Sequence, residues 1–138
     1  MADTAKTPRR SLGTSETVHV VGMTHLDLAW LYDSTHYREC QEVVAVRMLD
    51  LLDHDPEFTY LIEQFLHFRW LNETRPDLIG RIAKYVREGR VEIGGGMASS
   101  LDTNGPNGEG YVRSHLLGSA WAKEHLGGTA KVGELMDT

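Results

Sequence analysis

A chain of 138 residues, with 41% hydrophobic and 25% charged residues, suits one globular domain with a modest core. The net charge is -6 and both signs are interleaved along the chain, which argues against nucleic acid or an anionic membrane surface as a partner. The single cysteine, Cys40, excludes an intrachain disulfide, and no apolar run approaches the roughly 20 residues that span a bilayer. Residues 1–17 are polar and lack the apolar stretch of a secretory signal, so we expect a disordered tail and a cytoplasmic protein.

From Val18 onward, short apolar runs alternate with longer segments of helical period. This alternation predicts an α/β fold in which parallel strands alternate with helices. Strands are expected at 18–23, 58–64, 91–96 and 130–136, and helices at 36–55, 65–75, 76–88 and 111–126, the second and third separated by a break before Pro76.

The first helix is expected to begin after a cap at Ser34 or Thr35. The apolar face that we expect it to bury consists of Tyr37, Cys40, Val44, Met48, Leu51 and Leu52. The fourth strand has no helix after it, although a parallel strand normally leads into one that covers the sheet. We therefore expect the sequence to be part of a larger domain.

Polar residues follow the predicted strands where they end. His25 and Asp27 follow the first strand, Glu63 lies at the end of the second, and Asp137 follows the fourth. Functional groups of parallel α/β folds collect at this edge of the sheet. Two residues apart in extended backbone, His25 and Asp27 point to the same side and can share a metal ion, with Asp137 as a possible third ligand. Imidazole with carboxylates suits Zn²⁺, with Mn²⁺ or Co²⁺ as substitutes.

Less specific interpretations remain open for each of these residues. A histidine at a strand end is more often a hydrogen-bonded structural residue, and Trp30 taken alone fits the core better than a sugar-packing role. Glu63 is equally compatible with a solvated position at the start of the next helix. The run Gly94-Gly95-Gly96 lacks the pattern of a phosphate-binding loop and is better explained by close approach of a neighbouring strand or ligand. For the remaining histidines on predicted helices, packing or surface roles are favoured: His36, His54, His67, His115 and His125.

Several ordered blocks carry a family resemblance. "HLDLAW", "IEQFLHFRW", "GRVEIGGGMASSLDTNGPNGEGYVRSHLLG" and "KVGELMDT" resemble, in this order, the amino-terminal catalytic domain of glycoside hydrolase family 38, the α-mannosidases. The similarity covers residues 18–138. It implies a zinc-dependent, retaining hydrolase of α-mannosides on a distorted (β/α) barrel, of which this sequence is the first part.

The resemblance also assigns roles. His25 and Asp27 match metal ligands, Trp30 matches an aromatic residue of the sugar subsite, and Asp137 matches the aspartate that contacts the metal and acts as nucleophile. The sequence departs from the family pattern at Met97, at Ser114 and in the approach to Asp137, where Glu134 and Met136 stand. The family's acid/base carboxylate and a further histidine ligand have no counterpart here, so the isolated chain is expected to have little activity of its own.

Two other functions compete with this one. A metal-dependent carbohydrate deacetylase or amidohydrolase would also use the His25-x-Asp27 pair, with a metal-bound water attacking an acyl carbon. A non-catalytic chain that binds a sugar or metal, forms an oligomer, or completes its site with a separately encoded remainder of the domain is the third possibility.

Overall fold

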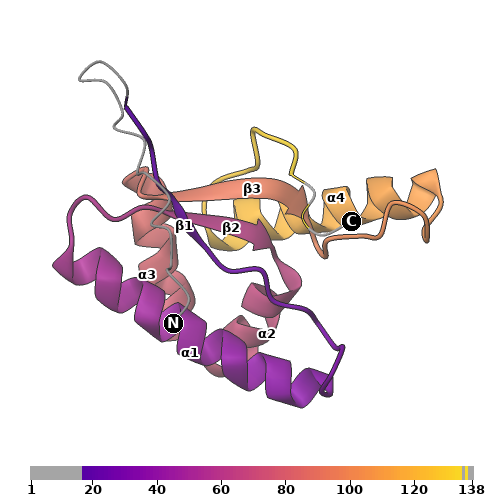
Figure 1. The fold of residues 1–138 in the computed structure, drawn as a ribbon, viewed down its shortest axis with the longest axis horizontal. Helices are drawn as coiled ribbons and strands as arrows, with labels where there is room; N and C mark the ends of the chain where they lie inside the picture. Colours follow the sequence, from indigo (N-terminus) through magenta and orange to yellow (C-terminus); the bar gives the residue numbers. More distant parts are fainter. Residues whose placement is uncertain (1–16, 135, 137–138) are drawn as a thin grey trace, which may run out of the picture.

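The computed structural model describes residues 17–134 and 136. Three parallel strands form one sheet in the order β1-β2-β3: β1 (Gly22–Met23), β2 (Tyr60–Gln64) and β3 (Val91–Met97). Tyr60 of β2 is in register with Gly22 on one side and Val91 on the other. All pairs are parallel and helices connect them (Figure 1), which confirms the predicted α/β class. Of the predicted tail, residues 1–17, only Thr17 lies within the described residues.

Four helices connect and follow the strands: α1 (Ser34–His54), α2 (Leu66–Thr74), α3 (Pro76–Arg87) and α4 (Gly108–His125). Pro76 occupies the first turn of α3, where its missing N–H is not needed, so the chain breaks into two helices as predicted. The fourth helix begins at Gly108, three residues earlier than predicted, because the Asn107 side chain accepts a hydrogen bond from the Gly110 N–H at 3.0 Å.

The predicted start of α1 was wrong by one or two residues. Asp33 is the cap: its Oδ1 accepts the N–H groups of Thr35 and His36 at 3.0 and 3.1 Å. The predicted buried face was also partly wrong, because Leu51 is 48% exposed. The face that α1 buries is rotated toward the following residues: Tyr37, Gln41, Ala45, Met48, Leu49 and Leu52.

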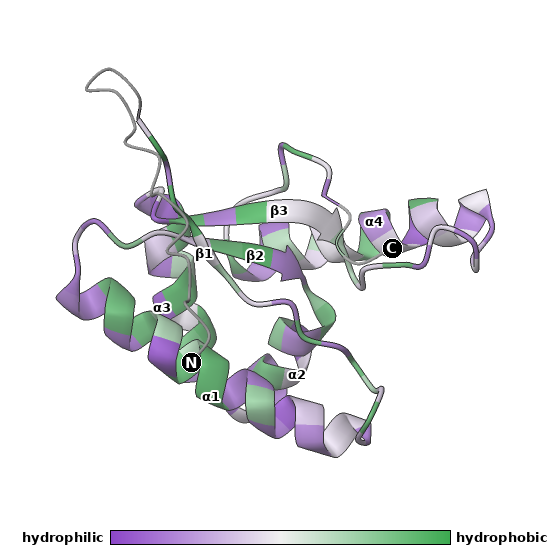
Figure 2. Ribbon diagram, in the orientation of Figure 1, coloured by the Kyte–Doolittle hydropathy of each residue, from purple (hydrophilic) through white to green (hydrophobic). Residues whose placement is uncertain are grey.

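One hydrophobic core joins the helices to one side of the sheet. In β2, Tyr60 and Ile62 are buried in it, and in β3 Val91 and Ile93 join them. Alternate side chains of a strand point to opposite faces, so Glu63 lies on the other face from Ile62. Figure 2 shows β2 passing from apolar to hydrophilic residues at its carboxyl end. Figure 1 shows α1, α2 and α3 gathered to one side of the strands, while α4 runs beside β3.

The two outer positions of the sheet are less regular than the sequence predicts. The strand expected at 18–23 is reduced to Gly22–Met23, and Val18 and Val20 are 63% and 85% exposed. The strand expected at 130–136 is represented, among the described residues, by a single parallel bridge between Gly94 and Val132. Both segments lie beside only one strand of the described chain, so main-chain pairing stabilises them from one side. Within the described part of the chain, no helix combines the length and apolar character needed to cross a membrane.

The glycines of β3 permit close packing, as predicted. A Cβ on Gly94 would lie 2.9 Å from Leu61 Cδ1, and a Cβ on Gly96 would lie 2.7 Å from Ala130 Cβ. Gly96 also has φ +75°, a conformation that favours glycine. On the helix side, a Cβ on Gly118 of α4 would lie 2.5 Å from the backbone of β3 and the residue after it. Small residues therefore bring residues 130–134 and α4 against the carboxyl half of β3.

Candidate active site

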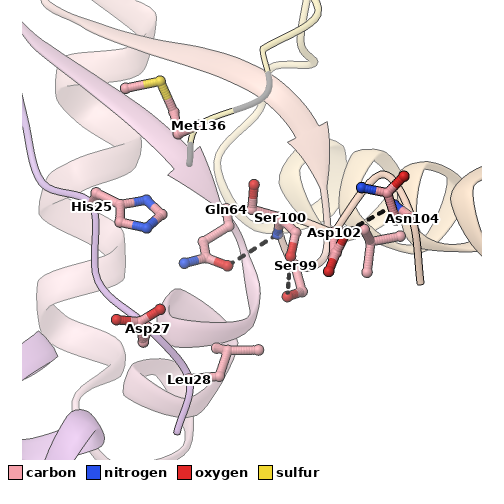
Figure 3. A pocket seen from close by; sticks show the side chains of 10 residues that line it. His25, Asp27, Leu28, Gln64, Ser99, Ser100, Asp102, Asn104 and Met136 are labelled. Atoms are coloured by element: carbon pink, nitrogen blue, oxygen red, sulfur yellow. Dashed lines mark hydrogen bonds between the residues drawn. The ribbon is translucent and has the colours of Figure 1, made fainter. Parts of the chain in front are cut away.

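A cavity of about 380 Å³ opens where the three parallel strands end. His25 and Asp27 follow β1, Gln64 is the last residue of β2, and Ser100 belongs to the loop after β3 (Figure 3). Parallel strands place these ends at one edge of the sheet, as the sequence predicted for the first two residues. The complete lining is His25, Asp27, Leu28, Gln64, Ser99, Ser100, Leu101, Asp102, Asn104 and Met136.

The His25 ring is held by a buried carboxylate. Its Nδ1 lies 3.0 Å from Oε1 and 2.9 Å from Oε2 of Glu63, whose side chain is 3% exposed. The His25 side chain itself is 32% exposed, so it reaches from the buried carboxylate to the surface of the cavity. A carboxylate that accepts from one nitrogen of a histidine fixes the ring orientation and makes the other nitrogen more basic. The solvated interpretation of Glu63 is therefore wrong.

A second carboxyl group lies near Glu63. Burial, followed by the charge of Glu63, raises the pKa of Glu134 above its usual value. Glu134 belongs to the segment that passes beside β3, and its Oε2 lies where a side chain on Gly94 would stand. The glycine in β3 therefore lets this carboxyl group approach the face of the sheet that also carries Glu63.

The predicted site residues fall into two groups. His25 and Asp27 line the same cavity, which brings together the pair that the sequence selected. Trp30 is 75% exposed and is absent from the lining of that cavity, so the core interpretation of this residue is wrong. Asp137 lies outside the described residues, although Met136 beside it lines the cavity.

Glu63, Gln64 and Glu134 were not assigned a role from the sequence. The signal for the first two was their position at the carboxyl end of a strand rich in apolar residues, next to a predicted ligand pair. Their burial, which the sequence does not show, points to a role, because a buried carboxylate or amide needs a hydrogen-bond partner within the protein and a solvated one does not. Of the helical histidines, His67 is 2% exposed and packs in the interior, as the packing interpretation predicts.

The residues present suit part of a metal site. His25 and Asp27 offer an imidazole nitrogen and a carboxylate from one short segment, and Glu63 supplies the outer hydrogen bond that metal-binding histidines usually make. Among the described residues there is no group of three or more His, Cys, Asp or Glu side chains that could hold a metal. His25 and Asp27 thus offer two metal ligands, and a third ligand would have to come from another residue.

Comparison with known proteins identifies the same architecture. The family model "Glycosyl hydrolases family 38 N-terminal domain" matches residues 15–138. The chain is 30% identical to Alpha-mannosidase 2C1 of Homo sapiens over 115 residues, and 31% identical to Alpha-mannosidase G of Dictyostelium discoideum over 111 residues. These alignments cover 83% and 80% of this chain but only 11% and 10% of the two relatives.

A solved structure shows the same fold. The crystal structure of an alpha-mannosidase from Enterococcus faecalis V583 superposes with a TM-score of 0.71 at 23% sequence identity, over 80% of this chain and 12% of that one. The chain therefore spans about a tenth of the length of the relatives and the solved structure that it matches.

Proposed function

This chain belongs to glycosyl hydrolase family 38, and from that premise we propose that it forms part of the active site of a zinc-dependent, retaining α-mannosidase. The observation that carries the proposal is the pair His25 and Asp27 in one cavity at the strand ends, with His25 held by the buried Glu63. Zinc, or Mn²⁺ or Co²⁺ in its place, would be held by His25 and Asp27 together with Asp137.

The side chains of this chain would prepare the site for the metal and the sugar. Glu63 accepts the hydrogen bond from His25 Nδ1, so Nε2 would be the ring nitrogen that binds the metal. When bound, the metal would coordinate sugar hydroxyls and stabilise charge that develops in the transition state. Around it, Ser99, Ser100 and Asn104 give the cavity hydrogen-bonding groups suited to a polyhydroxylated ligand. The exposed Trp30 would pack against the apolar face of the sugar.

Retention of configuration requires two carboxyl groups. One attacks the anomeric carbon, and a second, about 5–5.5 Å away, first protonates the leaving oxygen and then activates water. We assign the first role to Asp137. The second we place outside residues 1–138, which is in keeping with relatives about eight times as long as this chain. Turnover would thus need further residues of the domain, supplied on the same or a second polypeptide.

Metal binding is the first test of this proposal. The 138-residue chain should bind Zn²⁺ in competition with a chromophoric chelator, and His25→Ala should abolish most of that binding because it removes one ligand. His54→Ala is the matched control, since its side chain is 78% exposed on the end of α1. Equal zinc binding by the wild-type chain and the His25 variant would make His25 a structural residue.

Substrate class is the second test. A chromogenic α-mannoside and an acetylated amino sugar should be offered to the chain alone, and to the chain mixed with a polypeptide that carries the rest of a family 38 domain. We expect release of mannose only in the mixture. Deacetylation without mannoside hydrolysis would replace the proposal with the deacetylase alternative.

A further inference from the structure

The carbonyl oxygen of Leu26, the residue between His25 and Asp27, receives two side-chain hydrogen bonds. Gln64 Nε2 donates to it at 2.7 Å and His67 Nε2 donates to it at 2.8 Å. Both donors are buried, with exposed fractions of 6% and 2%. Two buried side chains thus donate to the same carbonyl oxygen, that of the residue between the two proposed metal ligands.

The His67 ring is specialised for this contact. The ring nitrogen that faces the Leu26 carbonyl carries an N–H. Because a carbonyl oxygen can only accept, that N–H is on Nε2. The other ring nitrogen, Nδ1, is buried without a hydrogen-bond partner in the described part of the chain. The buried ring thus leaves its Nδ1 without a partner while its Nε2 donates to the Leu26 carbonyl.

Gln64 extends the contact to a second loop. Its Oε1 accepts the Ser100 N–H at 3.1 Å while its Nε2 donates to Leu26 (Figure 3 shows the bond to Ser100). The register between β2 and β3 shifts between Ile62 and Gln64, at the point where this side chain bridges the loops that follow β1 and β3. One buried amide thus fixes the two loops that line the cavity relative to each other.

We propose that Gln64 and His67 are positioning residues that hold the Leu26 peptide and thereby aim His25 and Asp27 together into the cavity. Side chains two residues apart in extended backbone share a side only while the peptide between them keeps its orientation. Rotation of the Leu26 carbonyl would turn the two flanking side chains away from a common point. For metal affinity the inference rests on the proposed function, whereas for the order of the loop it does not.

Two substitutions test the inference by removing the hydrogen bonds to the Leu26 carbonyl. His67→Phe removes the Nε2 donor and keeps a ring beside Trp70, and Gln64→Leu removes both amide bonds. In ¹⁵N relaxation measurements, we expect the order parameters of the His25, Leu26 and Asp27 amides to fall from about 0.85 to below about 0.6 in both variants. We also expect the Zn²⁺ dissociation constant to rise about tenfold to hundredfold, as for other losses of outer hydrogen bonds at metal sites.

Two further variants separate positioning from general destabilisation. Ile82→Val alters a fully buried core residue of α3, away from the Leu26 contact, so it should lower the unfolding temperature without changing the loop's order parameters or zinc affinity. His67→Gln keeps an N–H donor and should restore much of both. Unchanged order parameters for residues 25–27 in His67→Phe and Gln64→Leu would overturn the inference. A wild-type chain that binds no zinc would contradict the proposed function. The order parameters of residues 25–27 would still show whether Gln64 and His67 hold the loop.

Discussion

The two faces of β2 serve different purposes, and adjacent residues show the contrast. Ile62 is 1% exposed and packs in the core, whereas Glu63 turns to the opposite face, where it accepts a hydrogen bond from His25. Packing of Ile62 buries apolar surface, whereas the hydrogen bond to Glu63 orients His25, which lines the cavity. Because side chains alternate along a strand, one residue of this dipeptide packs in the core and the next contacts a residue of the cavity. Substitutions on the two faces should have separable effects, which the following predictions test.

The largest effect is expected on the helix side of the sheet. Leu49→Ala should lower the free energy of unfolding by about 2–5 kcal/mol, because Leu49 of α1 is fully buried in the core and leaves a cavity behind. Urea denaturation gives the value. Under native conditions the zinc affinity of the folded fraction should stay close to that of the wild-type chain. A large loss of affinity at unchanged fraction folded would show that the two faces are not independent.

An overpacking substitution sharpens the comparison. Gly118→Ala should cost about 1–3 kcal/mol in unfolding free energy, since the new Cβ would lie 2.5 Å from backbone atoms of Gly96 and Ala98. Gly80→Ala is the matched control: it lies in α3 and its Cβ would meet nothing within 4 Å, so it should stabilise by roughly 0.5–1 kcal/mol. Equal values for the two variants would mean that α4 does not pack on β3 as closely as described.

On the opposite face, Glu63→Gln should affect binding more than stability. The amide keeps the shape of the side chain but replaces one of the two carboxylate oxygens that lie within hydrogen-bond distance of His25 Nδ1, so the ring is held less well and the Zn²⁺ dissociation constant should rise about tenfold to hundredfold. Glu92→Gln on β3 is the control, because Glu92 is exposed. Isothermal titration of both variants gives the ratio, and similar dissociation constants would refute an orienting role for Glu63.

The smallest effect concerns acid stability on the helix side. The hydrogen bond from Tyr85, followed by the charge of Arg81, lowers the pKa of Asp53 in the folded chain. A depressed folded pKa adds stability above the unfolded value of about 3.9, and that stability is lost as the pH falls through this value toward the folded pKa. Asp53→Asn should therefore flatten the pH dependence of the unfolding temperature below about pH 4 and leave it unchanged near neutrality. An equally steep dependence in the variant would assign the acid sensitivity to other groups.

The order of strands and helices could be predicted because it depends on local periodicity and on strong punctuation such as Pro76. The family could be predicted as well, because several blocks occur in one order, and the comparisons confirm it. Caps and faces were less predictable: Asp33 competed with two neighbouring hydroxyl residues for the same role, and the buried stripe of α1 includes Gln41, whose polarity argued against burial.

Within the candidate site, the sequence predicted residues that line the cavity but not their buried partners. His25-x-Asp27 stands out because ligand-type residues follow an apolar strand, and both line the cavity. The buried partners could not be identified in the same way, since Glu63, Gln64 and His67 acquire their roles through contacts with residues 38 to 41 positions away. Those contacts depend on β1 and β2 lying side by side, which is a property of the folded sheet and not of any local pattern.

The most direct test of the central claim is a crystal structure of the chain grown with Zn²⁺, with anomalous data collected at the zinc edge. One strong peak should lie about 2.0–2.2 Å from both a ring nitrogen of His25 and a carboxylate oxygen of Asp27. The hydrogen bond between His25 Nδ1 and Glu63 should be retained. A fully loaded crystal in which zinc lies away from this pair would contradict the assignment of the cavity as the metal-binding part of the active site.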